Sequence, residues 1–347
     1  MSKCSTPSRS RTAVPAPSRN SSGALPRTSS SDRCRLAHSK GPAALLRGGT
    51  FCRIRRHDTA GETPLQSRAQ ELLLANDLTG ALDALQDAVR AKPADAKLRI
   101  FLFQLLCVMG DWKRAINQLK LSATMDKDAE EMAKAYREVL RCEVFREKVF
   151  TGEREPLVFG EPNEWIALLM EALKLLAAGK PGEAATLREK AFEAAPAIGG
   201  EINGERFEWI ADADMRLGPV LEAVVNGRYF WMPFAAIREL HVEEPADLRD
   251  AVWTGARVTL QNGGEVTAFI PTRYPGTVES GNGAAMLSKL TDWVDAGGET
   301  FVGIGQRLLA TETGDTALMD LRTLHMDAAP GAAASDAEEA SAPPAGA

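Results

Sequence analysis

Apolar residues recur at helical spacing between residues 64 and 195 and divide this segment into amphipathic stretches. In the clearest of them, Leu82, Leu85 and Val89 share one face of a helix that Pro93 ends. The same spacing predicts helices over residues 65–76, 96–109, 128–150 and 165–178. We expect six or seven helices in this part of the chain, most of them in antiparallel pairs.

Two of the predicted helix pairs repeat each other. Residues 111–115 (DWKRA) align with residues 77–81 (DLTGA) at an offset of 34 residues, which is the tetratricopeptide period. A fainter third copy covers residues 179–196 and places Ala184 where the first two copies have Ala81 and Ala115. Because such pairs bury their apolar faces only by stacking on a neighbour, the sequence predicts a tetratricopeptide-like domain over residues 61–198.

Beyond residue 198 the apolar pattern changes to that of strands. Residues 257–261 and 265–270 alternate apolar and polar positions around Asn262-Gly263, which predicts a β-hairpin. Short helices are predicted over residues 217–225 and 281–290. Further strands are predicted over residues 228–232, 237–242, 301–304, 306–310 and 317–324. Residues 199–326 are therefore predicted to form a smaller β-rich (α+β) domain, and the chain as a whole belongs to the α+β class.

The two ends of the chain differ from the middle in composition. Residues 1–60 are rich in Ser, Arg and Pro, with acids only at Asp32 and Asp58, and their apolar residues have no period. We interpret them as a disordered basic extension, for which an over-long gene start would account, although organellar transit peptides share this composition. Residues 327–347 contain mostly Ala, Gly, Pro and acids and predict a disordered tail.

The overall composition excludes several classes of protein. The net charge of −6 argues against a nucleic-acid binder, which is usually basic. The sequence contains no run of 18 apolar residues, so it predicts no membrane span. The 5 cysteines are odd in number and form no C-x-x-C motif, which fits the reducing cytoplasm.

Catalytic and cofactor motifs are also missing from the sequence. The 4 histidines lie apart from other metal ligands, and neither H-E-x-x-H nor G-x-x-x-x-G-K-[ST] occurs. No G-x-S-x-G motif is present, and the G-x-G fragments at 281–283 and 303–305 lack the context of a dinucleotide site. The sequence predicts no catalytic residue, cofactor or metal.

Residues 209–234 (WIADADMRLGPVLEAVVNGRYFWMPF), here called the seam, join the helical part to the β-rich part. Asp212 and Asp214 could bind a cation or act as acid and base. We favour a structural role, either as a cap of the next helix or in an ion pair with Arg216 or Arg228.

The aromatic residues of the seam alternate along a predicted strand, so half of them should face the core and half could form an interaction surface. We therefore select as candidate protein-binding residues Trp209, Asp212, Asp214, Arg216, Arg228, Tyr229, Trp231 and Phe234.

The chain resembles the ImpE/TagJ accessory proteins of bacterial type VI secretion systems from about residue 72 to about residue 321. The stretches that carry this resemblance are LRIFLFQLLCVMGDWKRAINQL, FEWIADADMRLGPVLEAVVNGRYFWMPF, LRDAVWTGARVTLQNGGEV, PTRYPG and GQRLLAT. The resemblance implies a non-enzymatic adaptor that binds the N-terminal helix of the small contractile-sheath subunit. It also implies a link between the sheath and the AAA+ unfoldase ClpV, and it transfers no catalytic residue.

Two other hypotheses stay open at this point. A hydrolase or cation-binding protein could use Asp212 and Asp214, and a purely structural scaffold would bind the sheath without the unfoldase. The adaptor could bind its partner helix either in the repeats or at the seam, and we favour the seam because it has more aromatic residues than a small core needs.

Overall fold

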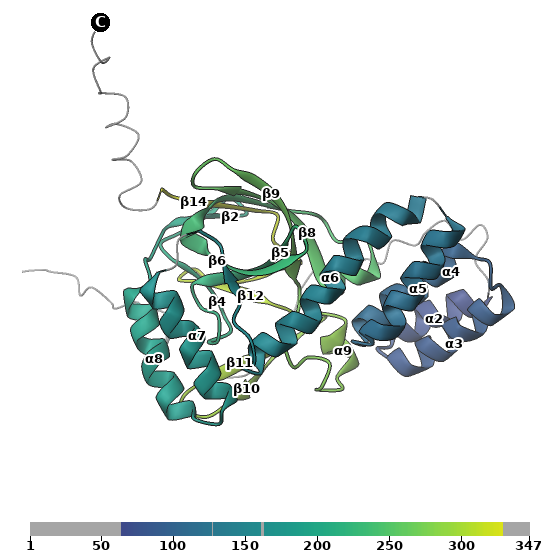
Figure 1. Cartoon of the computed structure of the whole chain (residues 1–347), viewed down its shortest axis with the longest axis horizontal. Coiled ribbons are helices and arrows are strands. Elements are labelled where there is room, and N and C mark those ends of the chain that lie inside the picture. The colour runs from purple at the N-terminus through teal and green to yellow at the C-terminus, as the bar shows by residue number, and fades with distance from the viewer. Residues whose placement is uncertain (1–63, 127, 161–162, 329–347) are drawn as a thin grey trace, which may run out of the picture.

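The computed structural model describes residues 64–126, 128–160 and 163–328 (Figure 1). Seven helices occupy the first part of these residues, in agreement with the predicted six or seven. None of the described helices combines the length and the apolar composition that a membrane crossing requires. The helices are α2 (Pro64–Leu74), α3 (Leu78–Ala91), α4 (Ala96–Val108), α5 (Trp112–Met125), α6 (Asp128–Phe150), α7 (Glu164–Ala177) and α8 (Pro181–Ala194).

The repeated DxxxA pattern has a direct structural cause. Asp77 and Asp111 are the N-caps of α3 and α5, and their carboxylates accept the amide hydrogens of Gly80 at 2.9 Å and Arg114 at 3.0 Å. Ala81 and Ala115 follow one turn later and are fully buried. Each copy therefore begins with a capped helix whose small residue allows the preceding helix to approach closely.

The third copy contains helix α8, which pairs with α7, and this pair lies elsewhere in the molecule. Figure 1 shows α7 and α8 beneath the sheet and α2–α5 at the other side of α6. Trp165 of α7 and Phe192 of α8 share a core with Leu217, Val220 and Trp231 of the seam. The α7–α8 pair thus buries its apolar surface against the β part.

The β part contains one curved nine-stranded sheet with the order β1-β6-β5-β9-β8-β7-β14-β2-β3, one two-stranded sheet (β10-β11) and one three-stranded sheet (β13-β12-β4). Its strands are β1 (Leu157–Val158), β2 (Gly200–Ile202), β3 (Glu205–Phe207), β4 (Ile210–Asp212), β5 (Val220–Val225), β6 (Arg228–Pro233), β7 (Ile237–Val242), β8 (Trp253–Leu260), β9 (Glu265–Pro271), β10 (Thr291–Asp295), β11 (Phe301–Gly305), β12 (Leu308–Thr311), β13 (Asp315–Ala317) and β14 (Thr323–Met326). Three short helices complete it: η1 (Phe234–Ala236), η2 (Leu248–Ala251) and α9 (Gly283–Met286).

Several predictions for the β part are confirmed. Asn262-Gly263 connects β8 to β9, and these strands pair antiparallel with Val258 opposite Val266. The predicted strands over 228–232, 237–242 and 301–304 correspond to β6, β7 and β11, and the candidate at 306–310 overlaps β12. The candidate at 317–324 is wrong as one strand, because a turn separates β13 from β14 there.

The helix predicted over 217–225 is also wrong, because these residues contribute strand β5. All six residues of β5 are buried and five of them are apolar, so polar and apolar positions do not alternate along it. Strand β5 pairs with β6 on one side and with β9 on the other, and a strand covered on both faces has an apolar run like that of a buried helix. The helix predicted over 281–290 is reduced to the single turn α9.

Helices α4 and α6 each pack one face against the β part. The ring of Tyr136 on α6 lies 5.9 Å from that of Trp253 and 5.2 Å from that of Phe269. Arg273, in the loop after β9, donates to the carbonyl oxygens of Val108 at 2.6 Å and Cys107 at 3.1 Å, at the end of α4. A cation at a helix C-terminus stabilises it, so the loop after β9 both caps α4 and fixes the repeats to the sheet.

Candidate functional site

The seam contributes to a buried cluster of charges between α6 and the sheet, here called the polar junction: Glu143, Arg146, Asp212, Glu222, Tyr229 and Arg307. Glu222 lies at its centre, in the middle of β5, and is fully buried. Arg146 of α6 donates to both carboxylate oxygens of Glu222, from Nε at 2.5 Å and from Nη2 at 2.8 Å. The Arg307 guanidinium and the Tyr229 hydroxyl also donate to Glu222. One carboxylate therefore joins a helix to three segments of the β part.

The two acids of the predicted pair have different partners. Asp214 forms an ion pair with Arg216, with 2.5 Å between Oδ2 and Nη2, as one of the structural hypotheses expected. Asp212 instead forms its ion pair with Arg307, which the sequence did not indicate. The amide hydrogens of Asp214 and Gly303 donate to Asp212 and Asp214 respectively, both at 2.9 Å. Neither acid caps a helix, because a strand follows them.

The charges of the junction shift the pKa values of two carboxyls in opposite directions. Burial alone would raise the pKa of Glu222, but Arg146 and Arg307 outweigh it and lower the pKa to about 2. Burial raises the pKa of Asp212 to about 7, against the opposing effect of Arg307. The difference follows from the partners, since Glu222 has two arginines and Asp212 shares one of them.

The hydrogen-bonding groups of the junction are saturated. Among buried side-chain polar atoms of the described residues, only Nε of Arg249 lacks a partner. No group of His, Cys, Asp or Glu in the described part of the chain is arranged to hold a metal ion. A buried cluster in which each charge has a partner is suited to holding α6 on the sheet. It is less suited to catalysis, because a catalytic acid needs an open position beside the substrate.

Most of the candidate protein-binding residues lie in the interior. Trp209, Tyr229, Trp231 and Phe234 are buried together with Asp212 and Asp214, Arg216 is partly buried, and Arg228 is exposed. Trp231 is fully buried and donates from Nε1 to the Tyr229 hydroxyl at 2.9 Å. The predicted exposed half of the aromatic cluster is reduced to Phe230, which is partly buried beside Phe159, with ring centroids 5.2 Å apart. A direct role of these residues in protein binding stays a prediction.

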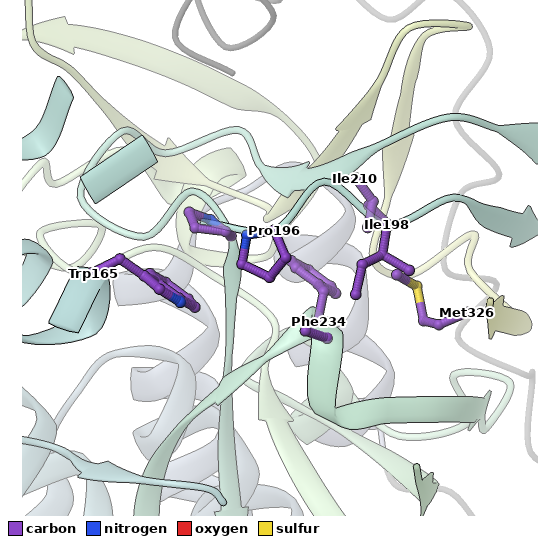
Figure 2. Close-up of a pocket in the computed structure, with 8 residues that line it drawn as sticks. Trp165, Pro196, Ile198, Ile210, Phe234 and Met326 are labelled. Carbon is purple, nitrogen blue, oxygen red and sulfur yellow. The ribbon is translucent and has the colours of Figure 1, made fainter. Parts of the chain in front are cut away.

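A small crevice lined by apolar residues, here called the seam pocket, also borders the seam. Figure 2 shows Phe234 of η1 and Ile210 of β4 converging with Pro196, Ile198 and Met326 near the indole of Trp165. The complete lining is Trp165, Pro196, Ile198, Ile210, Pro219, Phe234, Ala235 and Met326. All eight lining residues are apolar, but the space between them is about 10 Å³, which is room for about one water molecule.

Sequence reasoning missed the residues that complete both features. Glu143 and Arg146 occur on the long helix α6, Arg307 follows the sheet β10-β11, and Trp165 opens α7. One signal was available: Glu222 interrupts the apolar run VLEAVV, and a carboxylate in a buried strand requires cationic partners. The sequence does not say which of the many arginines supply them.

Comparison with known proteins identifies the family. The family model of the ImpE protein matches residues 204–325, and that of the tetratricopeptide repeat matches residues 72–138. The type VI secretion system accessory component TagJ of Pseudomonas aeruginosa is 52% identical over 259 residues, which cover 75% of this chain and 91% of that protein. The chain belongs to the ImpE/TagJ family.

A solved structure supports the fold of this ImpE/TagJ protein. The crystal structure of protein VPA1032 from Vibrio parahaemolyticus matches with a TM-score of 0.69 and 26% identity, over 75% of this chain and 97% of that one. The matched tetratricopeptide model contains both clear copies of the repeat and excludes the third. The family and the predicted order of helical repeats followed by a β-rich part are thereby confirmed.

Proposed function

We propose that this protein is a non-enzymatic accessory protein of a bacterial type VI secretion system and acts in the cytoplasm as an adaptor for the contractile sheath. The observation that carries the proposal is the 52% identity to a type VI secretion accessory component over 91% of that protein's length. In this proposal the adaptor binds the N-terminal helix of the small sheath subunit and links the sheath to the ClpV-type AAA+ ATPase.

The seam pocket supports a specific mode of binding for the sheath helix. An amphipathic helix presents large apolar residues at positions i, i+3/i+4 and i+7. One such residue would insert at the seam pocket between Trp165 and Phe234 by moving the lining apart, since the present space of about 10 Å³ holds about one water molecule. Its neighbours would lie along α7. The lining of the pocket comes from α7, β4, η1 and β14 and from the connecting segments that contain Pro196, Ile198 and Pro219, so several parts of the fold set its shape.

The proposed link to the ATPase needs a second surface, and the fold offers one at a distance from the pocket. Helices α2–α5 project from the far side of α6 in Figure 1. The polar junction holds α6 to the sheet through Glu222 and Arg146. An adaptor of this kind would keep its two partners at a fixed separation.

Peptide titration tests the proposal directly. A fluorescent peptide with the N-terminal helix of the cognate sheath subunit is titrated into the full-length protein, and micromolar or tighter saturable binding is expected. Ala235→Leu places a larger side chain in the seam pocket and should weaken binding about tenfold, at a cost of about 1.4 kcal/mol. Ala236→Leu is the matched control, because Ala236 is the next residue of η1 and does not line the pocket.

The outcomes distinguish whether the sheath helix binds from where on the protein it binds. No binding to a folded wild-type protein would remove the sheath helix as a partner, and the N-terminal domain of the ATPase would then be tested alone. Equal weakening by both substitutions would place the helix elsewhere. A pull-down that retains the sheath but never the ATPase would favour a purely structural scaffold.

The alternative of an enzyme or cation site at Asp212 and Asp214 has less support. Both carboxylates are buried and engaged by arginines, so a divalent cation would have to displace Arg307 or Arg216. Calorimetric titration with Mg²⁺, Mn²⁺ and Ca²⁺ is expected to give no binding heat, and saturable binding that Asp212→Asn abolishes would revive this alternative.

A further inference from the structure

The sequence contains four Asn-Gly pairs, whose asparagines are Asn203, Asn226, Asn262 and Asn282. Asparagine before glycine is prone to deamidation, because glycine has no side chain to hinder the approach of its backbone nitrogen to the asparagine amide. All four asparagines are exposed to solvent. Since the following residue and the exposure are alike in the four pairs, hydrogen bonds have to decide which of them reacts.

Deamidation at such a pair uses the two residues themselves and water. The backbone nitrogen of the glycine attacks Cγ of the asparagine, a C–N bond closes a succinimide ring, and the side-chain nitrogen leaves as ammonia. Water then opens the ring at either carbonyl and gives aspartate or isoaspartate. Hydrogen bonds that hold the asparagine side chain, or that engage the glycine N–H, have to break before the attack and therefore slow it.

Two of the pairs occupy equivalent turns. Asn203-Gly204 joins β2 to β3 and Asn226-Gly227 joins β5 to β6, each as the two central residues of a hairpin. The φ angles are 50° and 85° in the first turn and 49° and 71° in the second. Positive φ at both central residues is the conformation of a type I′ turn. The backbone thus gives both asparagines the same starting geometry.

The side chains of these two asparagines have different surroundings. Oδ1 of Asn203 accepts the amide hydrogens of Arg322 at 2.8 Å and Thr323 at 3.1 Å. Its Nδ2 donates to the carbonyl oxygen of Asp320 at 3.0 Å. The side chain of Asn226 forms no hydrogen bond with another described residue. Three bonds therefore restrain the first side chain, whereas the second can rotate toward its neighbouring nitrogen.

The third pair is restrained at both reacting groups. The N–H of Gly263, which would be the attacking nitrogen, donates to the carbonyl oxygen of Leu260 at 2.9 Å. Oδ1 of Asn262 accepts the amide hydrogen of Gly264 at 3.0 Å. Deamidation at Asn262 would have to break both bonds, so this exposed hairpin turn is protected in the folded protein.

The fourth pair is restrained because its asparagine caps a helix. Oδ1 of Asn282 accepts the amide hydrogens of Ala284 at 3.0 Å and Ala285 at 3.2 Å at the start of α9. Among the four pairs, only Asn226-Gly227 has neither its side-chain amide nor its glycine N–H bonded to another described residue.

We propose that Asn226 is a site of spontaneous deamidation in this protein. Its turn packs on helix α6: a β-carbon built on Gly227 would lie 3.1 Å from Cβ of Glu138 and 3.3 Å from its Oε2. The product places a new carboxylate beside Glu138, and isoaspartate also adds a methylene to the backbone of the two-residue turn. The reaction therefore weakens the contact between the β5-β6 hairpin and α6.

Peptide mapping of the full-length protein tests the proposal. Trypsin releases each Asn-Gly pair on a separate peptide, over residues 191–206, 217–228, 258–273 and 274–289. The folded protein is incubated at mildly alkaline pH and digested at mildly acidic pH, and mass spectrometry measures the deamidated fraction of each peptide over time. Residues 217–228 are expected to react about tenfold faster than residues 191–206, which corresponds to about 1.4 kcal/mol in activation free energy.

A parallel incubation in guanidinium chloride is the control for sequence effects. Unfolding removes every hydrogen bond that protects the other three asparagines, so the four peptides should then react at similar rates. The consequence for α6 is measured with Asn226→Asp, which should unfold at a lower urea concentration than the wild type. Asn262→Asp is the matched control, because its carboxylate can still accept the amide hydrogen of Gly264, and it should unfold like the wild type.

Three outcomes would contradict these expectations. Equal rates for residues 191–206 and 217–228 in the folded protein, or a faster reaction in either of the other two peptides, would overturn the assignment of Asn226. The same ranking in guanidinium chloride would show that hydrogen bonds do not set it. Wild-type stability of Asn226→Asp, together with an unchanged melting temperature of protein rich in isoaspartate, would overturn the effect on the contact with α6.

Discussion

The polar junction and the seam pocket are built from the same 26-residue stretch, yet one is saturated and the other is open. In the junction, every charge contributed by the seam has a partner from α6 or from residues 303–307. The pocket is lined by apolar residues and leaves a small crevice of about 10 Å³ beside the seam. The paired charges of the junction stabilise the fold, whereas the crevice of the pocket leaves apolar atoms available to a partner. The comparison therefore separates the residues that hold the fold from those that a partner could contact.

Removing the centre of the junction should have the largest effect. Glu222→Ala leaves Arg146 and Arg307 buried without their shared carboxylate, and breaking a buried pair in this way costs about 3–5 kcal/mol. Urea denaturation followed by tryptophan fluorescence measures the change in unfolding free energy. Glu265→Ala on the exposed end of β9 is the control, with an expected change within about 0.5 kcal/mol. A loss below about 1 kcal/mol for Glu222→Ala would mean that the junction does not hold α6.

The pH dependence of stability should distinguish the two carboxyls of the junction. Folding raises the pKa of Asp212 from 3.8 to about 7, so the folded state holds this proton more tightly and the unfolding free energy falls as pH rises through that window. Folding lowers the pKa of Glu222 from 4.5 to about 2, so its contribution is present above pH 4.5 and is lost as pH falls toward 2.

Asp212→Asn should therefore remove the decline above pH 4 and keep the loss at lower pH. Each unit of pKa difference corresponds to about 1.4 kcal/mol, and a change on the order of 1 kcal/mol between pH 5 and pH 7 would be measurable by urea denaturation. The same slope in the Asn variant and the wild type would show that Asp212 does not titrate in this range.

Truncation in the pocket should cost less than any change in the junction. Ile198→Val removes one methylene beside existing empty space, and such a change typically costs about 0.5–1.5 kcal/mol. The same denaturation measurement applies. A loss as large as that of Glu222→Ala would show that the pocket is closed in solution and would contradict its role as a binding site.

The smallest effect is expected at the exposed edge of the seam. Arg228 lies over the ring of Phe230, 5.7 Å from its centroid, and is exposed. Arg228→Ala should change the unfolding free energy by about 0.5 kcal/mol or less, because exposed cation–π contacts are weak. If it weakens the binding of the sheath peptide more than Ala235→Leu does, the binding surface lies on the Arg228 side of the seam.

The comparison also shows what the sequence could predict. Helix periodicity, the capped DxxxA repeats and the Asn262-Gly263 hairpin are local patterns, and each is confirmed. Strand β5 was mistaken for a helix because burial on both faces removes the alternation that identifies a strand. The ion pairs of Glu222 join residues 76 and 85 positions apart, and no local pattern specifies such a pairing. The seam was identified as important, but which of its faces is buried follows from tertiary packing.

Helix α6 has one consequence for how this protein can change over evolution. It is the last helix packed on α5 and also the helix that carries Arg146 to the sheet. A single inserted residue before Arg146 would rotate it by about 100° away from Glu222, and a seven-residue insertion would restore its direction but move it about 10 Å along the axis. The number of residues between Tyr136 and Arg146 therefore has to stay constant for both side chains to reach the β part. We expect insertions in relatives to fall in the loops outside this segment of α6.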